Sequence, residues 1–222
     1  MPQLQTFLQG VSVWALPVLA AVILHELAHG VVAKWCGDET ASRAGRLTLN
    51  PLAHIDPMGT IALPLFLLLA HAPFLFGYAK PVPVNFGQLR KPRRDMALVA
   101  AAGPLTNIAL AIISAAVLQL LLAVRLPHGS ALTGVAITTL TPVAMMAQRS
   151  VLINVVLAIF NLLPILPLDG GRVLAGLLPR PQAIAYARLE RYGMLIVVLL
   201  LATRTLDAVI GPVVNLFLRV LL

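Results

Sequence analysis

The chain has little cysteine and little charge. Cys36 is its only cysteine, which excludes an intramolecular disulfide and a zinc cluster built on cysteine, so any metal must be held by histidine and carboxylate. Charged residues make up 11% of its 222 residues, about half the fraction of a soluble domain, whereas 59% are hydrophobic. Apolar runs recur along the whole length. The composition therefore predicts one integral membrane domain over residues 1–222.

The formal net charge of +8 does not indicate a nucleic-acid-binding protein. The basic residues fall in short loops between apolar stretches rather than on one polar face, a distribution typical of the positive-inside bias of membrane proteins. The first five residues lack the basic region of a secretory signal, so we expect no cleaved signal. The lipid bilayer is the expected environment.

The apolar runs predict an all-α polytopic membrane protein, a bundle of about four to six transmembrane helices. Clear helices are expected at 6–36 and 96–124, and 150–163 carries the chain back across. Pro142 leaves 131–148 as an interfacial helix or half a span, and 193–222 forms one or two segments. Prolines within 58–76 favour a re-entrant segment there. Residues 44–50 alternate in polarity, which predicts a small extended or β element near the active site.

The sequence HELAH at residues 25–29 lies inside the first apolar stretch. His25 and His29 are four residues apart, so a helix places both rings on one face, within reach of a single ion. Glu26 sits beside that ion, where a carboxylate can take a proton from a water molecule that the metal activates. Three ionisable residues within five positions of a membrane helix are costly, which favours a functional site over a chance match.

A catalytic zinc ion usually has three protein ligands and an open position for water. Asp169 is the best candidate for the third ligand, because it is the only acidic residue between Asp95 and Glu190 and lies among prolines and glycines that interrupt the helix. The alternative is that Asp169 caps a short helix that starts at Gly170.

Three blocks in this order resemble the site-2 protease family, the M50-type intramembrane zinc metalloproteases. They are HELAHG at 25–30, AGPLTN at 102–107 and NLLPILPLDGGR at 161–172. The resemblance implies that His25, His29 and Asp169 hold Zn2+ and that Glu26 is the general base. It also implies transmembrane protein substrates, which such enzymes cut within the bilayer. The chain resembles compact members, without PDZ or CBS domains.

Several further residues are candidates for the reaction. Asn161 is the first choice as the donor that stabilises the oxyanion, with a helix-packing hydrogen bond as the alternative, and Asn107 is a second choice that would contact the substrate. Leu47 and Leu49 are expected to pair with an unwound substrate by strand addition. His54 is left without a role.

A second function class stays open on the sequence alone. A membrane metal-ion transporter or sensor could use the same His, His and Asp cluster, although it gives no reason for Glu26, and an inactive scaffold is a third possibility. The loop charges orient the expected active site toward the cytoplasmic side of a multi-pass protein in the plasma membrane of a prokaryote.

Overall fold

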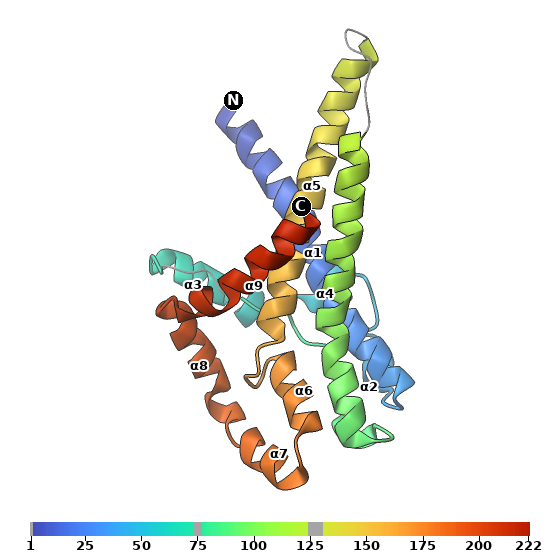
Figure 1. Ribbon diagram of the computed structural model, residues 1–222, viewed down its shortest axis with the longest axis vertical. Coiled ribbons are helices and arrows are strands. Elements are labelled where there is room, and N and C mark those ends of the chain that lie inside the picture. Colours follow the sequence, from blue (N-terminus) through green and yellow to red (C-terminus); the bar gives the residue numbers. More distant parts are fainter. Residues whose placement is uncertain (1, 73–76, 124–130) are drawn as a thin grey trace.

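Helices form all the regular structure in the part of the chain that the computed structural model describes, which is residues 2–72, 77–123 and 131–222. The longest are α1 (Pro2–Trp35), α4 (Pro92–Ala123) and α5 (Ala131–Asn161), which lie against one another (Figure 1). The shorter elements are α2 (Thr40–Arg43), η1 (Pro51–His54), η2 (Pro57–Ala62), α3 (Leu63–Leu69), η3 (Phe86–Gln88), α6 (Asp169–Leu177), α7 (Arg180–Ala187), α8 (Glu190–Ala202) and α9 (Thr205–Leu221).

Among the described residues, three helices are long and apolar enough to cross a membrane. They include Ser12–Trp35, Pro92–Ala123 and Thr139–Asn161, and a fourth span results if α8 and α9, which are bent by 79° at their junction, count as one. The expected number of four to six spans is therefore not confirmed. The prediction of a break near Pro142 is wrong, because α5 continues through this proline as a single helix. Neighbouring helices can satisfy the backbone groups that such a proline frees.

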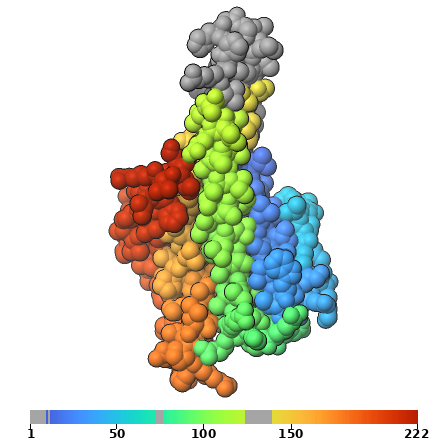
Figure 2. Space-filling view, turned by 45° about the vertical axis from the view of Figure 1, so that its right-hand side comes forward, coloured from blue at the N-terminus to red at the C-terminus, as the bar shows by residue number. Residues whose placement is uncertain are grey.

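Small residues on α4 allow the three long helices to approach closely. The buried side of α4 includes Ala100, Gly103, Asn107, Ala111 and Ala115, which recur at intervals of three or four residues. Ala111 and Ala115 pack with valines of α5 and α9 in a common apolar cluster. Close packing of small side chains is a main source of helix association in lipid. Figure 2 shows α4 running along the molecule between the C-terminal helices and the N-terminal segment.

The expected re-entrant segment and β element are not confirmed. The first part of 58–76 forms η2 and α3, and residues 73–76 lie outside the described part of the chain. Residues 44–50 contain no strand. The segment beside them cannot complete a ladder because Pro81 and Pro83 have no N–H, and the Arg46 side chain instead donates to the carbonyls of Lys80 and Pro81.

Residues 77–90 are held along α1 and the turn that follows it by three hydrogen bonds. The N–H of Arg90 donates to the Cys36 carbonyl at 3.0 Å, that of Asn85 to Asp38 Oδ2 at 2.7 Å and that of Val82 to Glu26 Oε2 at 2.9 Å. Burial alone would raise the pKa of Asp38, but hydrogen bonds from Thr40 and Asn85 outweigh it and lower that pKa. The segment is therefore fixed where it can form one wall of the site.

Candidate metal centre

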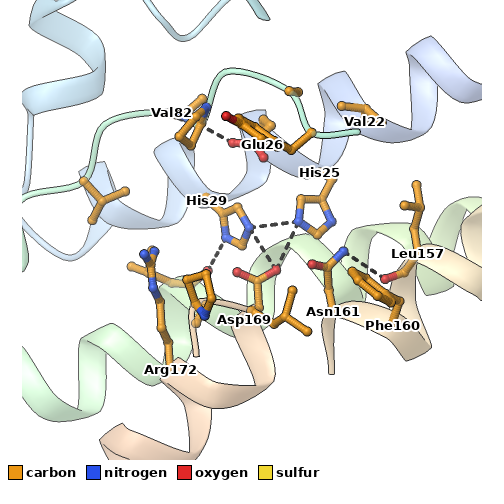
Figure 3. A pocket seen from close by; sticks show the side chains of 18 of the residues that line it. Val22, His25, Glu26, His29, Val82, Leu157, Phe160, Asn161, Asp169 and Arg172 are labelled. Atoms are coloured by element: carbon orange, nitrogen blue, oxygen red, sulfur yellow. Dashed lines mark hydrogen bonds and ion pairs between the residues drawn. The ribbon is translucent and has the colours of Figure 1, made fainter. Parts of the chain in front are cut away.

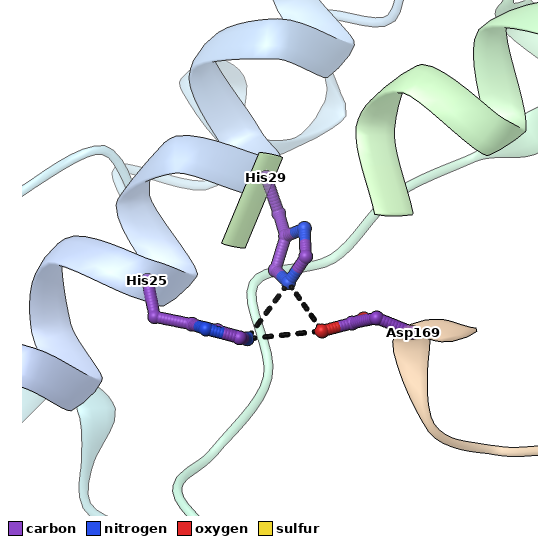
Figure 4. Close-up of side chains that lie close together, drawn as sticks. All are labelled: His25, His29 and Asp169. Carbon is purple, nitrogen blue, oxygen red and sulfur yellow. Dashed lines mark hydrogen bonds and ion pairs between the residues drawn. The ribbon is translucent and has the colours of Figure 1, made fainter. Parts of the chain in front are cut away.

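Two histidines of α1 and the first residue of α6 converge on one point (Figure 4). The Nε2 atoms of His25 and His29 lie 3.0 Å apart, and Asp169 Oδ2 lies 3.1 Å from the first and 3.3 Å from the second. All three residues are buried, with at most 9% of their surface exposed. The helical spacing of four residues brings the histidines together, as predicted, and the fold adds an aspartate from 140 residues further along the chain.

Hydrogen bonds at the far side of each ring decide which nitrogen carries the proton. His29 Nδ1 lies 2.7 Å from the Val99 carbonyl oxygen, which can only accept, so His29 is protonated at Nδ1. His25 Nδ1 lies 2.5 Å from Asn107 Oδ1. The orientation of that amide is set because its Nδ2 donates to the carbonyl of Ala21 at 3.2 Å. Both histidines therefore turn an Nε2 lone pair toward Asp169.

Three electron-pair donors that face one another require a cation between them. Asp169 Oδ2 is buried and has no hydrogen-bond partner among the described residues. Two ligands bound at about 2.1 Å to one tetrahedral ion lie roughly 3.4 Å apart, which is close to the separations of 3.0 to 3.3 Å found here. The donor set of two imidazoles and a carboxylate is typical of zinc. The cluster fits a metal ion.

Gly103 of α4 forms the floor of this cluster. A Cβ atom at this position would lie 2.5 Å from the Nε2 atoms of both His25 and His29, so any side chain would occupy the space where the three donors meet. Close helix packing is one reason for the small residues at 100–104. The structure gives Gly103 a second reason, which is that the metal position needs the room.

A chain of buried side-chain hydrogen bonds continues from His25 into α5. Asn107 Nδ2 donates to Asn154 Oδ1 at 2.7 Å, and Asn154 Nδ2 donates to the carbonyl of Ser150 at 2.9 Å. Asn107 and Asn154 are 0% and 1% exposed. Because a backbone carbonyl can only accept, it also sets the Asn154 amide, so Asn154 holds Asn107 in the orientation that His25 needs. Sequence reasoning missed Asn154, although a polar residue in an apolar helix was a signal.

A cavity of about 350 Å3 opens beside the cluster (Figure 3). Its lining includes the three donors together with Glu26, Asn161 and residues of the 77–86 segment. One carboxylate oxygen of Glu26 accepts the Val82 N–H, and Asn161 Nδ2 donates to the Leu157 carbonyl of its own helix at 3.0 Å. The structure thus brings five predicted site residues, His25, Glu26, His29, Asn161 and Asp169, to one cavity.

Other predicted residues lie away from this cavity. Leu47 packs on α1 at Gly30, where an added Cβ would come within 2.5 Å of Leu47 Cδ2, and Leu49 is 62% exposed. Asn107 lies behind His25 and does not line the cavity. His54 donates from Nε2 to the Thr48 carbonyl at 2.9 Å, which fastens its loop. Leu47, Asn107 and His54 therefore have structural contacts in the described residues, whereas Leu49 is exposed.

Comparisons with known proteins agree with this geometry. The family model of peptidase family M50 matches residues 13–203. Over 198 residues the chain is 37% identical to the putative zinc metalloprotease YwhC of Bacillus subtilis, covering 89% of this chain and 84% of that protein. It is 32% identical over 192 residues to the putative zinc metalloprotease Rip2 of Mycolicibacterium smegmatis, and the match covers 85% of this chain and 66% of that protein. No solved structure matches. Together with the three-donor cluster, these matches identify zinc as the cofactor.

Substitution of Gly103 by alanine should abolish zinc binding although it removes no ligand. The added methyl group would stand 2.5 Å from both Nε2 atoms. Alanine normally stabilises a helix by about 0.5–1 kcal/mol relative to glycine, so helix propensity opposes the expected loss. Zinc content of the purified protein measures the effect. Gly211→Ala in α9, where an added Cβ has no neighbour within 4 Å, is the control and should keep its zinc. Normal zinc content in Gly103→Ala would contradict this assignment.

Substitution of Asn154 by leucine should weaken zinc binding by about 10–100-fold, the usual effect of losing a residue that orients a metal ligand. The Asn107 amide loses its shorter acceptor, on α5, and keeps only the Ala21 carbonyl at 3.2 Å, so the tautomer of His25 is held less firmly. Competition with a chelator measures the affinity, and the 15N shifts of His25 report the tautomer. The control is Ser114→Ala, which removes only the hydroxyl group 2.7 Å from the Ser150 hydroxyl. It should retain both the zinc affinity and the His25 tautomer. An unchanged tautomer in Asn154→Leu would show that the α5 contact has no such role.

Proposed function

Since the chain belongs to peptidase family M50, we propose that this membrane zinc metalloprotease hydrolyses peptide bonds within or near the transmembrane segments of other membrane proteins. The depth of the metal site supports this proposal. Gly103 faces the cluster 11 residues after the start of α4, a rise of about 16 Å, which is near the middle of a hydrocarbon core of about 30 Å. The ion-transporter alternative is not favoured by the matches to peptidases.

Zinc held by His25, His29 and Asp169 would supply a Lewis acid that activates water and polarises the scissile carbonyl. Glu26 is the proposed general base and accepts the proton of the attacking water on its carboxylate. Its Oε2 is anchored by the Val82 N–H, which leaves Oε1 to take that proton. The same carboxyl group can then deliver the proton to the leaving amine. Val82 is thus proposed to position the base.

Asn161 is the proposed donor to the oxyanion that develops on the carbonyl. Its amide lines the cavity and is oriented by one N–H bound to Leu157, while the NH2 group carries a second hydrogen. The donor must act on a chain that is locally unwound, because a carbonyl inside a substrate helix is already hydrogen-bonded. The extended wall around Tyr78 and Val82, rather than Leu47 and Leu49, is the surface that such a chain would meet.

The location of the active site follows the distribution of charge. Basic residues gather at the end of α1 and before α4, and positive loops favour the cytoplasmic side. The matched relatives are bacterial proteins. We therefore propose a multi-pass protein of a prokaryotic plasma membrane whose active site opens toward the cytoplasm.

Substitution of Glu26 by glutamine should reduce proteolysis at least about 100-fold while zinc remains bound, because glutamine keeps the shape but cannot take a proton. The assay is cleavage of a transmembrane reporter in proteoliposomes, followed by mass spectrometry of the products. If Glu26→Gln cleaved the reporter at the wild-type rate, the assignment of Glu26 as the base would be disproved. Products cut only in the soluble part of the reporter would disprove the intramembrane position. Zinc flux without cleavage would favour a transporter.

Substitution of Val82 by proline should lower the cleavage rate about tenfold or more at unchanged zinc content, since it removes the N–H that anchors Glu26. The backbone should tolerate this change because Pro81 and Pro83 already flank it. Val82→Ala loses the same packing against Gly30 but keeps the N–H, and it should cleave faster than Val82→Pro. Equal rates in the two variants would assign the effect to packing instead.

A further inference from the structure

Residues from the first turns of α4, from α6 and from α7 line a second hollow. These elements lie at one end of the molecule (Figure 1). Its volume is about 360 Å3, and its lining combines two chemistries. Met96, Leu166 and Ile184 belong to an apolar wall, whereas three arginines and one glutamate supply charge. This combination suits an amphipathic ligand better than a wholly soluble one.

The charge of this hollow is not neutralised from within. Arg93, Arg172 and Arg180 line it together with a single acidic residue, Glu190, which leaves two positive charges in excess. Within residues 2–72, 77–123 and 131–222, no carboxylate lies within 4.0 Å of these three guanidinium groups. Buried or clustered guanidinium groups normally pair with a carboxylate or a phosphate. Arg93 and Arg180 are exposed and Arg172 is half-buried, so the hollow presents its excess positive charge to an anion that approaches from outside.

Two of these guanidinium groups are held in place by other contacts. Arg93 donates to the carbonyl of Leu178, just before α7, and Arg172 lies over the Phe86 ring with its Cζ 5.5 Å from the ring centre. Close packing supports them, because an added Cβ at Gly176 of α6 would lie 2.7 Å from the Arg93 carbonyl oxygen. These contacts limit the motion of the side chains, so less entropy is lost when an anion binds.

The hollow lies at the charged start of α4, where the basic residues of 90–94 give way to the apolar run from Met96, a sequence typical of a membrane boundary. Arg93 is in the first turn of α4, ten residues before Gly103, and hence about 15 Å along the helix from the metal site. With the metal site near the middle of a hydrocarbon core of about 30 Å, this distance reaches the boundary where lipid phosphates lie. Basic pockets between membrane helices are known to bind anionic headgroups.

We propose that this hollow binds the headgroup phosphate of an anionic phospholipid, with an acyl chain along the apolar wall. The three arginines receive the phosphate, and the apolar side chains favour a lipid over a free phosphate ion. Arg172 and Phe86 also line the catalytic cavity, so the bound lipid would brace a wall that the two hollows share. The proposal does not depend on the hydrolytic function.

Lipid binding to the full chain in neutral detergent tests the proposal, with short-chain phosphatidylglycerol and phosphatidylcholine as probes and native mass spectrometry as the readout. The test variant is Arg93→Gln/Arg180→Gln, which leaves Arg172 intact beside the catalytic cavity. The matched control is Arg188→Gln/Arg191→Gln, which removes two charges from the same region but from residues that do not line the hollow. Unchanged zinc content verifies folding.

Wild type should prefer phosphatidylglycerol, and the test variant should lose about 30-fold in affinity for it, because each basic residue near an anionic headgroup contributes roughly fivefold. The control should keep its affinity, and so should Arg93→Lys/Arg180→Lys, which retains the charge. Equal losses of affinity in the test and control variants would overturn the proposed site, because they would show a general attraction between basic residues and the anionic lipid. If inorganic phosphate alone bound as tightly as the lipid and displaced it, the proposal that the ligand is a lipid would be overturned.

Discussion

The structure depends on three electron-pair donors that face one another inside an apolar bundle. His25, His29 and Asp169 would repel without a cation between them, because their electron pairs point at one another at buried positions. Their arrangement persists because the far side of each imidazole is bound to an acceptor, the Val99 carbonyl or Asn107. The lone pairs are therefore directed before any ion arrives, which is the condition for tight and selective metal binding.

Helix α4 makes this arrangement possible, although it supplies no ligand to the metal. Gly103 leaves space at the centre, the Val99 carbonyl and Asn107 orient the two histidines, and small residues beyond them let α5 approach. Asn154 of α5 then completes the polar chain at full burial. Each of these groups has a partner, as a polar group at membrane depth requires. A metal site in lipid is thus a property of three packed helices and not of one motif.

The wall formed by residues 77–86 connects the metal site to its surroundings. Hydrogen bonds to Glu26 and Asp38 fix it along α1 and the turn that follows, so the proposed base and the cavity share one support. At its end, Phe86 and Arg172 separate the catalytic cavity from the basic hollow near the bilayer surface. A protease in a membrane must hold such a wall in place while it accepts an unwound chain, and neighbouring lipid is well placed to contribute.

The sequence by itself determined the membrane location, and it predicted the histidine pair, Glu26 as base and Asp169 as third ligand. The membrane location and the histidine pair are local features, because a four-residue helical repeat and the hydropathy of a run need no tertiary contact to be read. Asp169 was predicted as an isolated acidic residue among prolines and glycines, and the fold brings it to the pair. Only the tertiary structure decided that Gly103, Asn154 and Val82 surround the site, and that Leu47, Leu49 and Asn107 lie outside the cavity. It also replaced an expected β element by an irregular segment. The reason is that such roles depend on contacts between backbone and side-chain groups of distant segments, and the hydropathy pattern does not predict those contacts.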